Sequence, residues 1–223
     1  DEEIGLIITD YQPQLLSKLN QITFFPNSLF SVYDFLQGVH GFENKVLELE
    51  DFNWPKNAIF DYGPFRTLIV LENQLYATVF YDIDGHILRI AYPENGEHKA
   101  FILGIDSRGF ISNQDDDEKT IYFDPYGNWR FKKDKNTGKI TVNPETHFCK
   151  RREYENITDL VDEILIRYLK INVKNNDEMI VTVDDESSFS NKIIEPYKPL
   201  YLINSHHPYS KKVGSLAKAK VIV

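Results

Sequence analysis

Several features that would mark a familiar class of protein are scarce or absent in this sequence. Its single cysteine, Cys149, cannot form an internal disulfide, so the sequence is not a disulfide-stapled secreted domain. No stretch approaches the ~18 apolar residues that a membrane-spanning helix needs. The N-terminus lacks the basic and apolar regions of a signal peptide, and both ends read as strands of a longer chain. We therefore expect a piece of a larger cytoplasmic protein.

Common catalytic signatures are also missing. The sequence contains no G-x-G-x-x-G, P-loop, G-x-S-x-G or H-E-x-x-H motif, which weakens the dinucleotide, hydrolase and zincin interpretations. The net charge of -9 argues against a nucleic-acid partner, which requires a basic surface. No cofactor or metal is expected on this basis.

Aromatic residues are abundant, and they indicate β structure. The chain has 15 Phe and 13 Tyr, residues that favour half-buried pleated surfaces. Between residues 45 and 143, period-two alternation is broken by turns that end in glycine, which is typical of an antiparallel meander. Large residues on both faces imply that one face covers the rest of the protein or a partner. Strands are predicted at residues 45–50, 65–71, 75–81, 86–92, 98–105, 109–113, 120–123, 129–132 and 139–142.

The two ends of the chain have a different pattern, in which strands alternate with helices. A buried strand at 4–9 precedes a helix that begins near Pro13, and a short helix or turn at 30–37 ends at Gly38. A broad apolar stripe predicts a helix within 153–170, with Asn156 or Thr158 as its N-cap. Further strands are predicted at 178–183, 199–204 and 220–223, and a crossover helix at 211–219.

These patterns predict an α/β fold: a partial Rossmann-like half-domain with a large inserted antiparallel β-meander. We divide the chain into the start of the framework at 1–44, the extended sheet at 45–150, and the return to the framework at 151–223.

The candidate ligand site follows the strand predicted at 199–204. His206, His207 and Ser210 would lie beyond its carboxyl end, where open parallel sheets bind ligands. They could contact a sugar or phosphate, and the histidines could act as acid and base. The alternative is a loop whose histidines cap or pack. The acidic residues 184–186 could hold a ribose or metal, but they also suit the N-terminus of a helix.

Two other groups have simpler interpretations. The acidic run 115–118 lacks the glycine and final glutamate of an EF-hand, so we interpret it as a solvated hairpin tip. His147 lies two residues before Cys149, which on a strand would place both side chains on one face. No third partner for a nucleophile is evident, so Cys149 is interpreted as structural filler.

Five stretches in order along the chain resemble a known family, the first of the accessory secretory proteins of Gram-positive bacteria. That accessory Sec system exports glycosylated serine-rich adhesins. The stretches are VYDF at 32–35, DYGPF at 61–65, DSRGFIS at 106–112, YFDPYGNWRF at 122–131 and VNP at 142–144.

The resemblance implies a GT-B glycosyltransferase-like fold without transferase activity. It also implies work in a complex with two companion accessory secretory proteins, near the accessory SecA ATPase, with peripheral membrane association at the inner face of the plasma membrane. A protein of this family would bind partners and the glycosylated serine-rich adhesin, with Trp54 and Trp129 as aromatic candidates beside their core-packing alternative. Two rivals are the first half of an active GT-B glycosyltransferase that modifies an adhesin, and a structural β-domain without a ligand.

Overall fold

A computed structural model describes residues 5–40, 42–96, 98–174, 177–183 and 189–203. The chain forms two compact units that divide after Glu155. The three-part division into 1–44, 45–150 and 151–223 remains a prediction. Among the described residues, no helix is both long and apolar enough to cross a membrane.

The first unit begins with a parallel strand pair and two helices. Asp34 donates its backbone N–H to the Ser31 hydroxyl (3.2 Å), which caps the second helix, and Gly38 ends that helix at φ 69°. The predicted helix or turn at 30–37 is therefore correct from residue 32, but residues 30 and 31 belong to a strand that the sequence pattern did not reveal. The elements are β1 (Gly5–Ile8), α1 (Leu15–Gln21), β2 (Ser28–Ser31) and α2 (Val32–Gln37).

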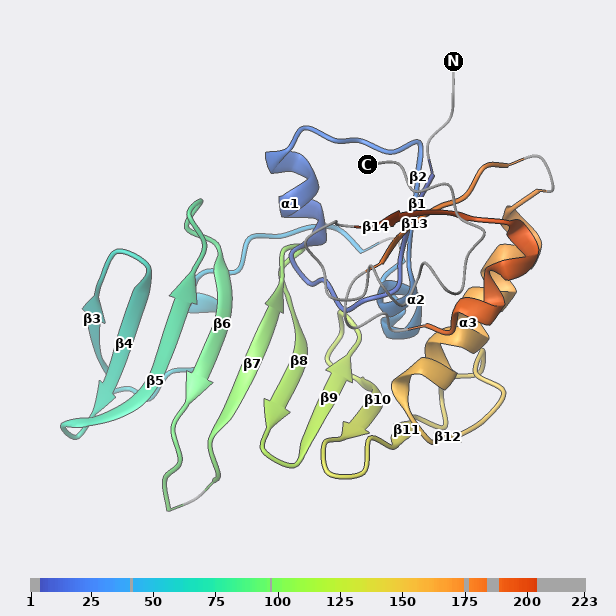
Figure 1. The fold of residues 1–223 in the computed structure, drawn as a ribbon. Helices are drawn as coiled ribbons and strands as arrows, with labels where there is room; N and C mark the ends of the chain where they lie inside the picture. Colours follow the sequence, from blue (N-terminus) through green and yellow to red (C-terminus); the bar gives the residue numbers. More distant parts are fainter. Residues whose placement is uncertain (1–4, 41, 97, 175–176, 184–188, 204–223) are drawn as a thin grey trace. The chain divides into compact units, whose positions relative to one another are not determined.

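A ten-stranded antiparallel sheet makes up the rest of this unit, and its strands follow chain order from β3 at one edge to β12 at the other (Figure 1). This confirms the predicted meander. The strands are β3 (Ile59–Tyr62), β4 (Arg66–Leu71), β5 (Gln74–Tyr81), β6 (Ile87–Tyr92), β7 (Phe101–Asp106), β8 (Phe110–Asp116), β9 (Lys119–Phe123), β10 (Trp129–Asp134), β11 (Ile140–Val142) and β12 (Glu153–Tyr154).

The strand predicted at 45–50 is wrong. These residues run as irregular chain into η1 (Leu49–Asp51), where the side chains of Glu48 and Asp51 cap each other's backbone N–H groups. Leu47 and Leu49 pack on the sheet instead of pairing with it. Their period-two spacing therefore reflects a segment that lies over the sheet without pairing with it. We call residues 47–54 the covering segment.

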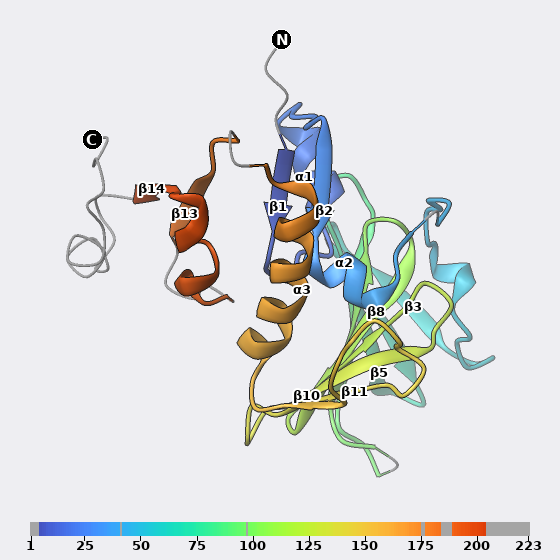
Figure 2. The ribbon, with the colours of Figure 1, turned by 90° about the vertical axis from the view of Figure 1, so that its right-hand side faces the viewer.

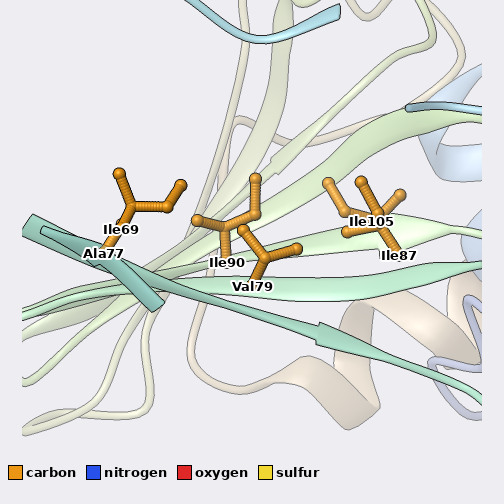
Figure 3. Close-up of a cluster of buried hydrophobic side chains, with 6 residues drawn as sticks. All are labelled: Ile69, Ala77, Val79, Ile87, Ile90 and Ile105. Carbon is orange, nitrogen blue, oxygen red and sulfur yellow. The ribbon is translucent and has the colours of Figure 1, made fainter. Parts of the chain in front are cut away.

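The core of the sheet is an aliphatic cluster, whose six side chains project from the same side of the strands (Figure 3). The covering segment packs on it through Phe52 and Trp54 as well, and the Trp54 indole N–H donates to the Leu49 carbonyl (2.6 Å). Trp54 is thus partly buried against the core, as its packing alternative expected. The cluster comprises Ile69, Ala77, Val79, Ile87, Ile90 and Ile105.

The second unit contains α3 (Ile157–Asn172) and a parallel strand pair. Asp159 donates its N–H to the Asn156 side chain (2.9 Å), so Asn156 rather than Thr158 is the N-cap. The predicted helix therefore begins later than residue 153, because Glu153–Tyr154 forms β12. The other elements are β13 (Ile180–Val183), η2 (Asn191–Ile193), η3 (Glu195–Tyr197) and β14 (Leu200–Ile203). The helix and strand predicted at 211–223 lie outside the described residues.

Candidate partner-binding surface

The pairing register assigns the side chains of the ten-stranded sheet to two faces, because directly paired residues share a face. The first face carries Val79, Ile90 and Leu103, and the covering segment packs on it. The second face carries a row of paired residues that crosses the sheet: Arg66, Phe80, Arg89, Gly104, Asn113, Tyr122 and Phe131.

We call β1, α1, β2 and α2, with the chain that joins them, the strand–helix half of the first unit. It packs on the second face over β8–β10 through a tyrosine cluster, Tyr11, Tyr33 and Tyr122. The Tyr122 ring lies 5.2 Å from that of Tyr11, 5.6 Å from that of Tyr33, and stacks on Phe131 at 4.3 Å. The Tyr11 hydroxyl donates to Ser112 Oγ (2.8 Å). Burial raises the pKa of all three phenols well above 10. Figure 2 shows β1, β2, α1 and α2 gathered on one side, next to the sheet.

Gln37, at the end of α2, fixes this helix to two strands. Its side-chain amide donates to the carbonyl oxygens of Ser112 (2.8 Å) and Phe123 (2.7 Å), and it is buried. A buried amide that satisfies two strand carbonyls allows little freedom of position, since losing either bond would leave a buried polar atom unpaired.

An ion-pair network is the second contact that holds α2 to the sheet. The Arg108 guanidinium donates two bonds to Asp34 in α2, both 2.8 Å, and two to Asp106 in β7, both 2.7 Å. Burial lowers the pKa of Arg108, but the hydrogen bonds to Asp106 and Asp34 outweigh it and raise the pKa overall. Charge-assisted, bidentate bonds of this kind fix orientation strongly. These contacts hold the strand–helix half against the sheet. We call the contact made by Asp34, Gln37 and Arg108 the junction.

Among the described residues, the second face is exposed at the other end of the sheet, over β3–β6. Ile59 is 64% exposed and Leu75 46% exposed, while Leu68, Val70 and Phe80 are half-buried. We call these five residues the open patch.

Charged residues border the open patch on the same face. Arg89 lies over the Phe80 ring at 4.6 Å, and Arg66 and Asp61 are exposed. Apolar side chains bordered by arginine are a combination enriched at protein–protein contacts. This surface is therefore the part of the described chain best suited to bind a partner.

A β-bulge places Leu75 in the patch. Ile69 pairs with Ala77 but Val70 pairs with Leu75, so Tyr76 is an extra residue in β5. The bulge shifts the alternation by one, and Leu75 joins Val70 on the second face instead of joining Ala77 on the first.

The predicted ligand residues His206, His207 and Ser210 lie outside the described residues, as do 184–186, and they stay predictions. His147 is exposed and Cys149 buried in irregular chain, so the expectation that they share a strand face is wrong. Within the described part of the chain, no group of three or more His, Cys, Asp or Glu side chains could hold a metal ion.

The structure describes the residues of two other interpretations from the sequence, the acidic run 115–118 and Trp129. The acidic run 115–118 ends β8 and forms the turn to β9, where Asp115 accepts a bond from Lys135 (2.8 Å). Trp129 is half-buried in β10 with the Lys132 ammonium over its ring at 4.3 Å. The junction residues Asp34, Arg108 and Gln37 were not predicted as a group, although the first two lie in stretches that carry the family resemblance.

Solved structures of related proteins share this fold. A complex of accessory secretory proteins 1, 2 and 3 from Streptococcus pneumoniae contains a chain 26% identical, with a TM-score of 0.78 over 89% of this chain and 42% of that one. A glycosylation associate protein complex from Streptococcus agalactiae matches at 24% identity and TM-score 0.84, over 98% of this chain and 46% of that one.

The fold is also shared with the pneumococcal O-GlcNAc transferase GtfA in complex with UDP and GlcNAc, at 12% identity and TM-score 0.57 over 90% of this chain and 40% of that one. The GtfA/B complex bound to UDP and GlcNAc matches at 12% identity and TM-score 0.57, over 97% of this chain and 59% of that one. This likeness confirms the predicted fold class, a GT-B type half-domain with an inserted antiparallel sheet.

Sequence comparison agrees. The accessory Sec system protein Asp1 of Streptococcus gordonii is 28% identical over 187 residues, which cover 80% of this chain and 35% of that protein. Its Staphylococcus aureus counterpart is 23% identical over 192 residues, covering 82% and 37%. This chain thus spans just over a third of the relatives' length. A family model described as accessory Sec system protein Asp1 matches residues 1–199, and the chain therefore belongs to that family.

Proposed function

We propose that this chain belongs to a non-catalytic component of the accessory Sec export complex. Its partners would be the two companion accessory secretory proteins, the accessory SecA ATPase and the glycosylated serine-rich adhesin. The protein would act in the cytoplasm, with peripheral association at the inner face of the plasma membrane. The observation that carries the proposal is the family match over residues 1–199. The fold shared with a chain in the complex of accessory secretory proteins 1, 2 and 3 supports it.

The geometry of the first unit suits a binding role. The network of Arg108 with Asp34 and Asp106 holds the sheet in a fixed orientation, and the open patch exposes apolar side chains on it. A preorganised surface loses little conformational entropy on binding, so more of its contact energy appears as affinity.

Co-purification of the intact protein with its two companion proteins tests this role. We expect a stable complex and no hydrolysis of sugar nucleotides by the isolated protein. An Ile59→Ser, Leu75→Ser double variant should weaken the complex, while Ile83→Ser, at a hairpin tip where Ile83 is 78% exposed, should not. A complex that is absent with the unaltered protein would contradict the proposal.

A second candidate is a half of an active GT-B glycosyltransferase that modifies an adhesin. The fold shared with GtfA/B favours it, although at 12% identity this likeness concerns the fold alone. Turnover of a sugar nucleotide by the isolated protein that disappears in a His206→Ala variant would establish this function and refute the non-catalytic one.

A further inference from the structure

The outer side of β3 is a free edge. Within the described residues, β3 pairs only with β4 and stands at the end of the sheet (Figure 1). Gly63 donates its N–H to the Arg66 carbonyl (2.8 Å) as the hairpin closes. Because backbone groups alternate along an antiparallel strand, Ile59 and Asp61 bond toward β4, whereas Phe60 and Tyr62 direct their N–H and C=O groups outward.

Of the features that usually protect an edge strand, β3 has two, its short length and the charge of Asp61, but it contains no lysine or proline. Lysine, proline or covering loops usually block such a strand. Here β3 reads Ile-Phe-Asp-Tyr, with Ile59 64% and Tyr62 71% exposed, and Phe65 in the adjoining hairpin is 58% exposed. The Phe60 and Tyr62 rings stack at 6.3 Å on the same face. The edge therefore offers the outward N–H and C=O groups of Phe60 and Tyr62 to a further strand, with apolar side chains beside them.

The single charge on β3 disfavours pairing with a second copy of this chain. In the antiparallel self-pairing that uses both outward residues, Phe60 of each copy faces Tyr62 of the other. The two Asp61 residues then face each other as a non-hydrogen-bonded pair, with Cα atoms only about 4.5 Å apart. Like charges directly opposite destabilise a sheet. The charge thus selects against the chain itself and for a strand of opposite charge.

We propose that β3 accepts an extended strand from a companion protein of the export complex. That strand would carry Lys or Arg opposite Asp61 and apolar side chains beside Phe60 and Tyr62, extending the sheet by β-augmentation. The inference rests on the proposed function, because the strand is sought in the companion proteins. It is continuous with the open patch, since Ile59 belongs to both.

Backbone hydrogen exchange on the intact protein, read by fragmentation mass spectrometry, tests the pairing directly. In the isolated protein, the outward amides of Phe60 and Tyr62 should exchange fast, while those of Ile59 and Asp61 are protected by β4. On addition of the two companion proteins, the outward amides should slow by about ten-fold or more, as expected for newly bonded amides. The inward amides serve as the control within the same strand.

Two variants test the same edge by affinity. Tyr62→Pro removes an outward donor without touching the bonds to β4, and Asp61→Lys reverses the charge without altering the backbone. Each should weaken assembly by about ten-fold, the loss of roughly 1.4 kcal/mol of contacts. Ile83→Ser, an exposed apolar residue at another tip, should assemble as the unaltered protein does.

The outcomes separate this inference from the proposed function. A complex that forms while the Phe60 and Tyr62 amides stay unprotected, or that tolerates both Tyr62→Pro and Asp61→Lys, overturns the edge pairing alone. Failure of the unaltered protein to bind either companion overturns both.

Discussion

Replacing Arg108 with alanine should be among the most damaging single changes in the first unit. The Arg108 side chain is only 12% exposed and Asp106 only 2% exposed. Arg108→Ala leaves the Asp106 carboxylate buried without its cation and removes both bonds to Asp34. Breaking a buried pair in this way costs about 3–5 kcal/mol. Arg108→Lys should recover only part of the loss, because an ammonium cannot reproduce the bidentate geometry.

The cost should depend on pH in a defined direction. Burial raises the pKa of Asp106, and Arg108 opposes that rise. Without Arg108 the pKa of Asp106 rises further above its unfolded value. A carboxyl whose folded pKa is raised destabilises the fold when ionised, and this penalty disappears as pH falls through the folded pKa. The stability deficit of Arg108→Ala should therefore shrink on acidification from pH 7.

Equilibrium urea unfolding of the intact protein, followed by circular dichroism at pH 7 and at lower pH, measures both effects. Arg66→Ala is the matched control, since Arg66 is an exposed arginine of the same sheet and should cost no more than about 0.5 kcal/mol. A loss below about 1 kcal/mol for Arg108→Ala, or a deficit that grows on acidification, would refute the reasoning about the junction.

Three further changes have defined outcomes. Gly109 has a φ of 87°, and an added Cβ would collide with the Lys45 carbonyl oxygen, so Gly109→Ala should cost more in urea unfolding than Gly85→Ala, which shares the backbone strain in open space. Stability should fall above pH 10, because the tyrosines of the tyrosine cluster ionise there only on unfolding. In a Tyr122→Phe variant, the fall of the unfolding free energy with pH should be less steep by up to about 1.4 kcal/mol per pH unit. Asn156→Ala should lower stability by about 1 kcal/mol in thermal melts, whereas Asn156→Asp should retain the cap.

Local patterns predicted most of the sheet because its contacts join neighbours in the chain. Four turn glycines, Gly85, Gly109, Gly127 and Gly138, have the positive φ that the hairpins require, and Gly96 is not among the positive-φ glycines. The edge strands β3 and β12 were missed. They are four and two residues long, too short for alternation to distinguish them from irregular chain.

The place of Leu75 in the open patch could not be predicted, because it depends on the bulge in β5. Strict alternation would place Leu75 with Ala77 and Val79 on the covered face. The bulge at Tyr76 reverses that assignment, and no residue type in this stretch indicates a bulge. A sequence argument can thus count the apolar residues of a strand correctly and still assign some of them to the wrong face.

The junction depends on contacts between residues far apart in the chain, which periodicity does not report. Asp34 and Arg108 are 74 positions apart, and Gln37 bonds to Ser112 across 75. However, these residues lie in or next to the stretches that carry the family resemblance: VYDF contains Asp34, and DSRGFIS contains Arg108 and Ser112.

The resemblance stretches therefore have a physical interpretation that their sequences alone do not give. Two of them meet at the junction, where Arg108 in one bonds to Asp34 in the other. A third, DYGPF, forms the end of β3 and its hairpin, and includes both Asp61 and Tyr62. One set fixes the orientation of the sheet and the other shapes its free edge. A chain that kept the junction but lost the edge is expected to keep the same fold and to lose the strand partner proposed for β3, and the Tyr62→Pro and Arg108→Ala variants separate those two contributions.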